Sequence, residues 1–173
     1  MVEEFEEEML IPKERIAVLI GDSGRDKKEI EKAGKIKLEI HEKENLVKIK
    51  AKDPLALWLG QQVVEAVGRG FNPKIAQKIF KEENSFELIR ISDYEKSKKK
   101  IKGLKGRIIG TQGKTKKIIQ NYTNTNIVVY GKTIGIIGPR EGTELARRAI
   151  EILLTGAKHG TAYRFLQEQT KND

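Results

Sequence analysis

The chain contains no cysteine and only two histidines, and aromatic residues make up 6% of it. The missing cysteines exclude disulfides, thiolate metal sites and cysteine nucleophiles. Two histidines, His41 and His159, do not favour a histidine metal site, and they make a Ser-His-Asp triad a poor prospect. The sequence therefore predicts no metal site, no cofactor and no catalytic residue, and we expect the protein not to be an enzyme.

Long apolar runs are also missing. None approaches the length of about 18 residues at which a membrane helix is predicted. The chain begins with the acidic segment MVEEFEEEM, whereas a signal peptide is basic and then apolar. We therefore expect no membrane association and a cytoplasmic location, and we expect Glu3–Glu8 to be a frayed, solvated end.

Positive charge is present in excess, and one half of the chain carries it. The net charge is +9 over 173 residues. Residues 1–84 hold 16 Lys and Arg against 17 Asp and Glu, whereas residues 85–173 hold 18 against 8. Charge needed only for solubility would not require this asymmetry, so the second half carries the footprint of a polyanionic partner.

An internal repeat divides the chain at the same place. When the chain is aligned with itself at an offset of 89 residues, segment 15–24 (RIAVLIGDSG) lies over 104–113 (LKGRIIGTQG). Apolar positions continue to match through most of each half. Two copies indicate a pair of small domains and not a solenoid. We place these domains at 1–84 and 85–173.

Each half shows the same predicted order, which is strand, helix, helix, strand, strand, helix. Period-two alternation marks the strands, and an Asp-Pro pair at 53–54 marks a helix start. The expected elements are Met9–Ile11, a helix from Pro12, 25–33, Ile36–Ile40, Leu46–Lys50 and 53–67, then Phe86–Ile91, Lys96–Lys105, 114–122, Asn126–Tyr130, Thr133–Ile137 and Arg140–Leu154. Further helices are expected at 72–80 and 160–168. The fold class is α+β, with helices layered on a small sheet.

A Gly-x-x-Gly loop separates the first two helices of each half, at 21–24 and 110–113. The motif alone is weak evidence, because the chain also carries it at 103–106 and 135–138. Only the first two copies lie between predicted helices at equivalent places in the repeat. Glycines there allow a tight turn and a close approach to a phosphate, and the following helix directs its free N–H groups at that ligand.

The second loop and its surroundings resemble the signature of the KH-domain family, whose loop clamps about four nucleotides of single-stranded RNA. Matching positions include Ile109, Gly110, Gly113, Ile119 and Ile127, whereas Lys116 stands where the family usually has an apolar residue. The element order is similar to the eukaryotic-type (type I) KH topology, with an extra C-terminal helix on each domain. The candidate RNA-binding residues are Arg107, Ile109, Gly110, Thr111, Gln112, Gly113, Lys114, Lys116, Lys117, Ile127 and Val129.

The first loop matches the KH signature less well. Asp22 lies in the loop, Gly34 replaces the threonine of the signature, and this half of the chain is nearly neutral. A carboxylate beside phosphates weakens binding, so this loop is a candidate for either a weak RNA site or a protein contact. The candidate residues are Gly21, Asp22, Ser23, Gly24, Arg25 and Lys28.

Two such domains and little else resemble the archaeal Dim-two family, also called partner-of-Nob-one. The segments GRIIG (106–110) and GAKHGTAY (156–163) carry most of this resemblance. It implies a small-subunit ribosome assembly factor that binds single-stranded rRNA near the 3′ end of 16S rRNA. It also implies the Nob-one endonuclease and the translation initiation factor two alpha subunit as partners. The alternative is a protein-interaction scaffold whose RNA binding is secondary.

Two other interpretations are weaker. Residues 108–115 (IIGTQGKT) differ from a Walker A loop by one missing glycine, but a basic helical stretch precedes them where a Walker loop needs a buried strand. We therefore do not expect nucleotide hydrolysis. Trp58 lies on an apolar helical stripe with Leu55, Leu59 and Val63, which predicts core or interdomain packing instead of base stacking.

Overall fold

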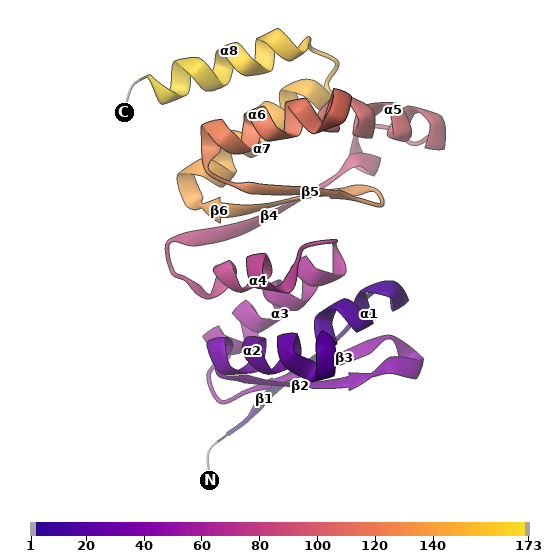
Figure 1. Cartoon of the computed structure of the whole chain (residues 1–173), viewed down its shortest axis with the longest axis vertical. Coiled ribbons are helices and arrows are strands. Elements are labelled where there is room, and N and C mark those ends of the chain that lie inside the picture. Colours follow the sequence, from indigo (N-terminus) through magenta and orange to yellow (C-terminus); the bar gives the residue numbers. More distant parts are fainter. Residues whose placement is uncertain (1–2, 172–173) are drawn as a thin grey trace. The chain divides into compact units, whose positions relative to one another are not determined.

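The structure, a computed structural model, describes residues 3–171 and divides into two compact units, residues 1–82 and 83–173. Each unit contains one three-stranded antiparallel sheet with helices packed on one face of it (Figure 1). The α+β organisation expected from the sequence is therefore present, and it is built twice along the chain.

The first unit runs strand, helix, helix, strand, strand, helix, as the sequence predicts. Its elements are β1 (Phe5–Leu10), α1 (Lys13–Ile20), α2 (Arg25–Gly34), β2 (Ile36–His41), β3 (Leu46–Ala51) and α3 (Pro54–Gly68). The expected helix over 72–80 is instead a short helix, α4 (Pro73–Ala76), followed by a 3-10 turn (Gln77–Phe80). The Asn72 side chain caps α4 by accepting a hydrogen bond from the Lys74 N–H at 2.9 Å.

The second unit repeats this order and ends in a full helix. Its elements are β4 (Asn84–Arg90), α5 (Lys98–Ile109), α6 (Lys114–Thr123), β5 (Asn126–Tyr130), β6 (Thr133–Pro139), α7 (Arg140–Leu154) and α8 (His159–Thr170). Ser97 caps α5, since its hydroxyl accepts a hydrogen bond from the Lys100 N–H at 3.1 Å. The basic stretch predicted at 96–105 thus belongs to a helix that continues to the Gly-x-x-Gly loop.

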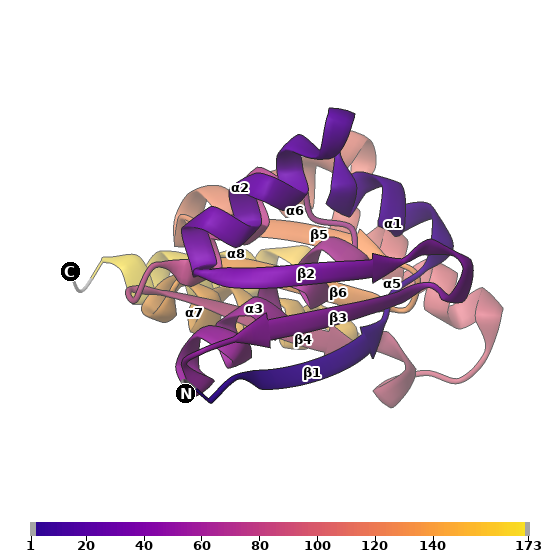
Figure 2. The ribbon, with the colours of Figure 1, turned by 90° about the horizontal axis from the view of Figure 1, so that it is seen from below.

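The two sheets have the same topology, with the last strand of each unit in the centre. Their orders are β1-β3-β2 and β4-β6-β5, and Figure 2 shows β3 between β1 and β2. Leu38 of β2 lies opposite Ile49 of β3, and Ile127 of β5 lies opposite Ile136 of β6. All four side chains are buried, because alternate residues of these strands face the helices.

A repeated hydrogen bond joins the second helix of each unit to the strand that follows it. The Glu31 carboxylate accepts from the Leu38 N–H at 3.0 Å, and the Gln120 side-chain oxygen accepts from the Ile127 N–H at 2.8 Å. Both pairs are separated by seven residues and are related by the 89-residue offset. These bonds satisfy the N–H group of an edge strand and fix the helix against the sheet.

The acidic N-terminal segment is not a frayed end, so that expectation is wrong. Residues 5–10 form β1, which pairs with β3 along its whole length. Lys48 lies 3.4 Å from a carboxylate oxygen of Glu6 and 3.7 Å from one of Glu8. Glu6 and Glu8, two residues apart on β1, lie opposite Lys50 and Lys48 of β3, so the strand pair places opposite charges side by side on one face.

Trp58 is not a core residue of the first unit, so the core alternative of the sequence prediction is wrong. Its side chain is 55% exposed, and that of Leu55, one turn earlier on α3, is 59% exposed. The buried face of α3 is instead formed by Leu57, Val63 and Val64. An apolar stripe on a helix of high overall hydrophobicity does not by itself identify the face that packs on the sheet.

Gly34 departs from the KH signature for a reason that the structure explains. A Cβ built at Gly34 would lie 2.4 Å from the Phe80 ring, so that ring occupies the space of a side chain. At the equivalent position of the second unit, Thr123 donates a hydrogen bond to the Ile119 carbonyl at 2.7 Å. Phe80, the last residue of the 3-10 turn after α4, thus fills the space that a side chain at position 34 would need.

We predict that Gly142→Ala destabilises the second unit. Gly142 is buried in the first turn of α7, and an added Cβ would lie 2.1 Å from the Thr123 carbonyl oxygen. The backbone of α6 must shift to accommodate it, which should cost about 1–3 kcal/mol in the free energy of unfolding. Urea unfolding followed by circular dichroism measures this cost. Gly160→Ala, whose Cβ meets nothing within 4 Å, is the control and should not lower stability.

Candidate nucleic-acid interface

The loop between α5 and α6 has a backbone that requires glycine at its ends. Gly110 and Gly113 both have φ +76°, a region that residues with side chains rarely adopt. Gln112 between them also lies in the left-handed region, at φ 54°. The Gly113 N–H donates to the Gly110 carbonyl at 3.1 Å, which closes the turn. The loop thus joins α5 to α6 through four residues, 110–113.

The first loop has the same backbone although its sequence differs. Gly21, Ser23 and Gly24 have φ values of 73°, 54° and 77°, each within three degrees of its equivalent in the second loop. Both loops are single 3-10 turns, at Asp22–Gly24 and Thr111–Gly113. Any functional difference between the two loops therefore comes from side chains and not from the path of the chain.

Several predicted RNA-binding residues gather at the second loop. Thr111 and Gln112 are exposed at its tip, and Lys114 is exposed on the first turn of α6. Lys117 is exposed and Lys116 half-buried on the next turn. The free N–H groups of α6 begin at this point, so the loop joins a helix N-terminus to a group of lysines, an arrangement that favours a phosphate.

None of the three apolar candidates, Ile109, Ile127 and Val129, is exposed. Ile127 is 2% exposed and belongs to the core of the second unit, so its side chain is closed off from a ligand. This corrects its place among the binding residues, because β5 directs Ile127 toward the helices. Val129 is half-buried and packs against the same core, while Ile109 is half-buried at the end of α5.

Arg107 does not extend freely toward solvent. Its Nη2 donates a hydrogen bond to the Ala157 carbonyl, between α7 and α8. Its own carbonyl accepts a hydrogen bond from Nε2–H of His159 at 2.9 Å. Because carbonyls in the last turn of a helix have no partner within the helix, His159 caps the end of α5. Arg107 and His159 together fix the start of α8 beside the loop.

Tyr163 and Thr115 complete this contact and were missed as site residues from the sequence. The Tyr163 hydroxyl donates to the Thr115 Oγ1 at 3.1 Å, and Thr115 packs against Gly110, where an added Cβ would lie 2.3 Å from Oγ1. The signal was available in the GAKHGTAY segment (156–163), which contains both His159 and Tyr163. Helix α8 therefore contacts both helices that flank the loop, α5 through His159 and α6 through Tyr163.

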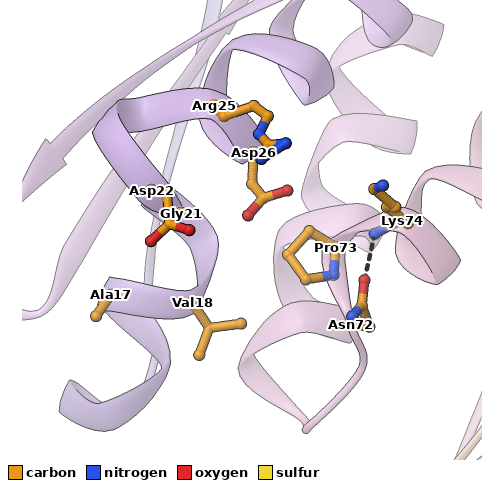
Figure 3. A pocket seen from close by; sticks show the side chains of 9 residues that line it. All are labelled: Ala17, Val18, Gly21, Asp22, Arg25, Asp26, Asn72, Pro73 and Lys74. Carbon is orange, nitrogen blue, oxygen red and sulfur yellow. Dashed lines mark hydrogen bonds between the residues drawn. The ribbon is translucent and has the colours of Figure 1, made fainter.

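A hollow lies beside the loop in each unit, at equivalent places in the repeat. In the second unit it has a volume of about 480 Å³, and in the first about 680 Å³. Figure 3 shows the first-unit hollow, with Asp26 pointing into the space between the loop and Pro73. Six lining positions correspond at the 89-residue offset, and in the first unit these are Ala17, Val18, Gly21, Asp22, Arg25 and Asp26. The extra helix closes the hollow in both units.

Comparison with known proteins agrees with this geometry. Residues 85–171 match the model of the second PNO1 KH domain, described as a eukaryotic-type KH domain (KH-domain type I). A KH domain-containing protein of Methanocaldococcus jannaschii is 46% identical over 163 residues, which cover 92% of this chain and 71% of the relative. The chain belongs to the archaeal Dim2/PNO1 family. This family consists of RNA-binding proteins that act in ribosome biogenesis.

Solved structures extend the Dim2 likeness to both units. The crystal structure of Dim2p from Pyrococcus horikoshii OT3 is 42% identical, with a TM-score of 0.87 over 95% of this chain and 99% of that one. A chain in the crystal structure of an a/eIF2alpha–aDim2p–rRNA complex from the same organism is 41% identical, with a TM-score of 0.91 over 98% and 96%. This chain thus shares the fold of both of its units with the Dim2p of P. horikoshii.

The charges at the two loops of this chain differ. The first loop carries Asp22 at its tip and Asp26 on the next turn, where the second loop carries Thr111 and Thr115. Arg25 is exposed between the two aspartates, which places both signs of charge at the first loop. A phosphate at the first loop would lie close to two carboxylates, and this repulsion weakens binding.

The Walker A alternative does not fit the loop at 110–113. Helix α5, not a strand, leads into Gly110, so no strand end directs a phosphate-binding turn. Between residues 3 and 171 no group of three or more His, Asp or Glu side chains is arranged to hold a metal ion. In the same part of the chain, no helix is long and apolar enough to cross a membrane.

We predict that Gly110→Ala and Gly113→Ala differ in their cost to stability. Both substitutions place alanine at φ +76°, which should cost about 1–2 kcal/mol in each case. An added Cβ at Gly110 also collides with Thr115, whereas at Gly113 it meets nothing within 4 Å. Thermal unfolding should therefore give a lower Tm for Gly110→Ala than for Gly113→Ala. Equal Tm values would show that Thr115 does not pack over the loop in solution.

Proposed function

We propose that this protein binds single-stranded rRNA through its second unit during assembly of the small ribosomal subunit. The observation that carries the proposal is the loop at 110–113, which has exposed side chains at its tip and leads into a lysine-rich helix N-terminus. It lies within the segment that matches the type I KH domain. Such a loop holds the backbone of about four nucleotides.

The 3′ end region of 16S rRNA is the proposed RNA target. Support comes from the family and from the similar Dim2p chain, which is part of a complex with rRNA. The exposed lysines of α5, namely Lys98, Lys99, Lys100 and Lys102, extend the positive surface away from the loop. A strand longer than the clamped nucleotides would meet these charges, which favour phosphates without reading sequence.

A protein-binding role for the first unit is the second candidate function. The same complex contains a/eIF2alpha, so we propose the translation initiation factor two alpha subunit as one partner and the Nob-one endonuclease as another. The near-neutral first unit, with Asp22 at its loop, is a poorer phosphate surface than the second. We propose that this unit is a diverged KH domain, that its surface serves the partner, and that RNA binding by residues 21–28 is minor. We further propose that the protein acts by binding, without an enzymatic step.

We predict that Thr111→Asp/Gln112→Asp weakens binding to a short strand copying the 3′ end of 16S rRNA by at least about tenfold, or ~1.4 kcal/mol. Two carboxylates at the loop tip would repel the phosphates that the loop holds. Fluorescence anisotropy measures the affinity, with a duplex of the same sequence as the control for strandedness.

The matched control is Ser23→Asp, which places a second carboxylate beside Asp22 in the first loop. It should leave RNA affinity within about twofold of the unchanged protein, since this loop already carries an acid at its tip. Capture of the initiation factor alpha subunit is measured on the same variants. Unchanged RNA binding by the Thr111/Gln112 variant would contradict the proposal that the loop holds RNA. The lysines of α5 would then be the candidate site.

We predict that removing Lys114, Lys116 and Lys117 together lowers the salt dependence of RNA binding. Each phosphate neutralised on a single strand contributes about −0.7 to the slope of log K against log salt concentration. The triple alanine variant should therefore have a slope less negative by about 2. Affinities measured from about 50 to 200 mM salt give this slope.

The repeat again supplies a matched control for the lysines. Arg25, Lys27 and Lys28 occupy the equivalent positions in the first unit, so their triple alanine variant removes the same charge from the other loop. A slope unchanged by this control would place the phosphate contacts in the second unit. A slope reduced as much as in the second-unit variant would mean that both loops hold RNA.

A further inference from the structure

The charges of the first unit are unevenly distributed, although their sum is close to zero. On its sheet, lysines and glutamates are paired. Glu6 and Glu8 of β1 form ion pairs with Lys48, and Glu39 of β2 lies 2.8 Å from Lys50. The acidic residues of β1 and β2 thus offset the lysines of β3, and the lysines of the helices are not included in this pairing.

Helix α2 carries a row of lysines that have no acidic partner. Lys28, Lys32 and Lys35 are exposed, and none of them forms an ion pair within residues 3–171. Lys28 and Lys32 lie one turn apart, and Lys35 directly follows the helix. Ile30, which lies on the opposite side of the helix, is fully buried, so these lysines point away from the core. We call Lys28, Lys32 and Lys35 the lysine row.

The second unit does not contain such a row. At the 89-residue offset, Lys32 corresponds to Asn121 and Lys35 to Asn124. The lysines of α6 are confined to 114–117, beside the Gly-x-x-Gly loop, whereas those of α2 continue to the end of the helix. The lysine row therefore belongs to the first unit alone, and it extends away from the first loop.

The carboxylates of α2 are directed elsewhere. Asp26 points into the hollow beside the loop (Figure 3). Glu31 accepts the hydrogen bond of the Leu38 N–H and lies 3.6 Å from Lys27, and Glu29 is half-buried. Figure 2 shows α2 on the β2 side of the sheet, with the acidic β1 at the opposite edge. A polyanion along the lysine row would therefore lie away from β1 and beyond the carboxylates of the loop.

The chemistry of the row favours the phosphate backbone of double-helical RNA. Lysine is depleted in protein–protein interfaces. Single strands are bound largely through aromatic side chains on which their bases stack, and α2 has no aromatic residue. Ammonium groups bind phosphates as point charges, without reading sequence. The lysine row extends over about 10 Å of a rigid helix, which suits the closely spaced phosphates of a double helix.

We propose that the lysine row of the first unit binds the phosphate backbone of a double-helical RNA segment. This segment is distinct from the single strand proposed for the second unit, and its bases are not read. The proposal goes beyond the proposed function and does not rest on it, because the row binds a duplex whether or not the loop at 110–113 holds a strand. The other surfaces of the first unit stay available for a protein partner.

The test is Lys28→Gln/Lys32→Gln/Lys35→Gln, measured by fluorescence anisotropy with a labelled, blunt-ended RNA duplex of unrelated sequence. The unlabelled 3′ strand is present in excess, so that it occupies the second loop. Each phosphate neutralised on a double helix contributes about −0.9 to the slope of log K against log salt concentration. The variant should bind the duplex at least about fivefold more weakly, with a slope less negative by about 2 to 3. Glutamine is as good a helix former as lysine, so the Tm should not change.

Lys37→Gln/Lys43→Gln/Lys52→Gln is the matched control. It removes the same charge from three other exposed lysines of the first unit, none of them on α2. The control should leave the duplex affinity and the salt slope unchanged. An equal loss in both variants would show that only the net charge of the unit matters, and it would overturn the proposal. Unchanged duplex binding by the lysine-row variant would overturn it as well.

Two further measurements separate the alternatives. Capture of the initiation factor alpha subunit is measured on the same variants. Its loss in the lysine-row variant, with unchanged duplex binding, would assign the row to an acidic protein surface and overturn the RNA proposal. Direct binding of a labelled 3′ strand tests the proposed function separately. If that strand did not bind, the proposed function would fail, whereas the duplex measurement would still decide the role of the lysine row.

Discussion

The structure of each unit depends on one break between two helices. At Gly110 the backbone turns to a positive φ, and Thr115 packs into the space where a side chain would otherwise be. At Gly21 the same space is filled by Asp26. This contact holds the start of the second helix against the end of the first, so the loop tip must point outward. The exposure of Thr111 and Gln112, and the position of the hollow behind them, follow from it.

The order of elements could be predicted because it depends on local signals. Glycine pairs end the first helices, Asp53 with Pro54 starts α3, and alternating apolar residues mark the central strands. These signals act within a few residues and occur twice, so the repeat removes the ambiguity that a single Gly-x-x-Gly motif leaves. The strand β1 was missed in part because glutamate is uncommon in strands. Its partner is β3, some 40 residues later in the chain, and no local pattern indicates that pairing.

The parts of the site that were missed depend on contacts between distant residues. Tyr163 meets Thr115 across 48 residues, and His159 meets the Arg107 carbonyl across 52. The sequence identified segment 156–163 as distinctive but could not place it, because helix periodicity does not show where a terminal helix packs. Ile127 illustrates the opposite error. It matches a signature position, yet that position serves the core, and a motif does not distinguish residues that build a site from residues that touch the ligand.

Duplication followed by charge divergence accounts for the difference between the two units. The φ angles of equivalent loop residues agree to within three degrees, so the path of the chain does not separate the functions of the two loops. The substitutions that distinguish them are Asp22 and Asp26 against Thr111 and Thr115, and Glu14 and Ala17 against Gly103 and Gly106. The first pair removes carboxylates from the second loop, and the second pair clears the helix surface beside it. The missing carboxylates remove a repulsion that a phosphate at the second loop would otherwise meet, and the two glycines lower the intrinsic stability of α5 relative to α1.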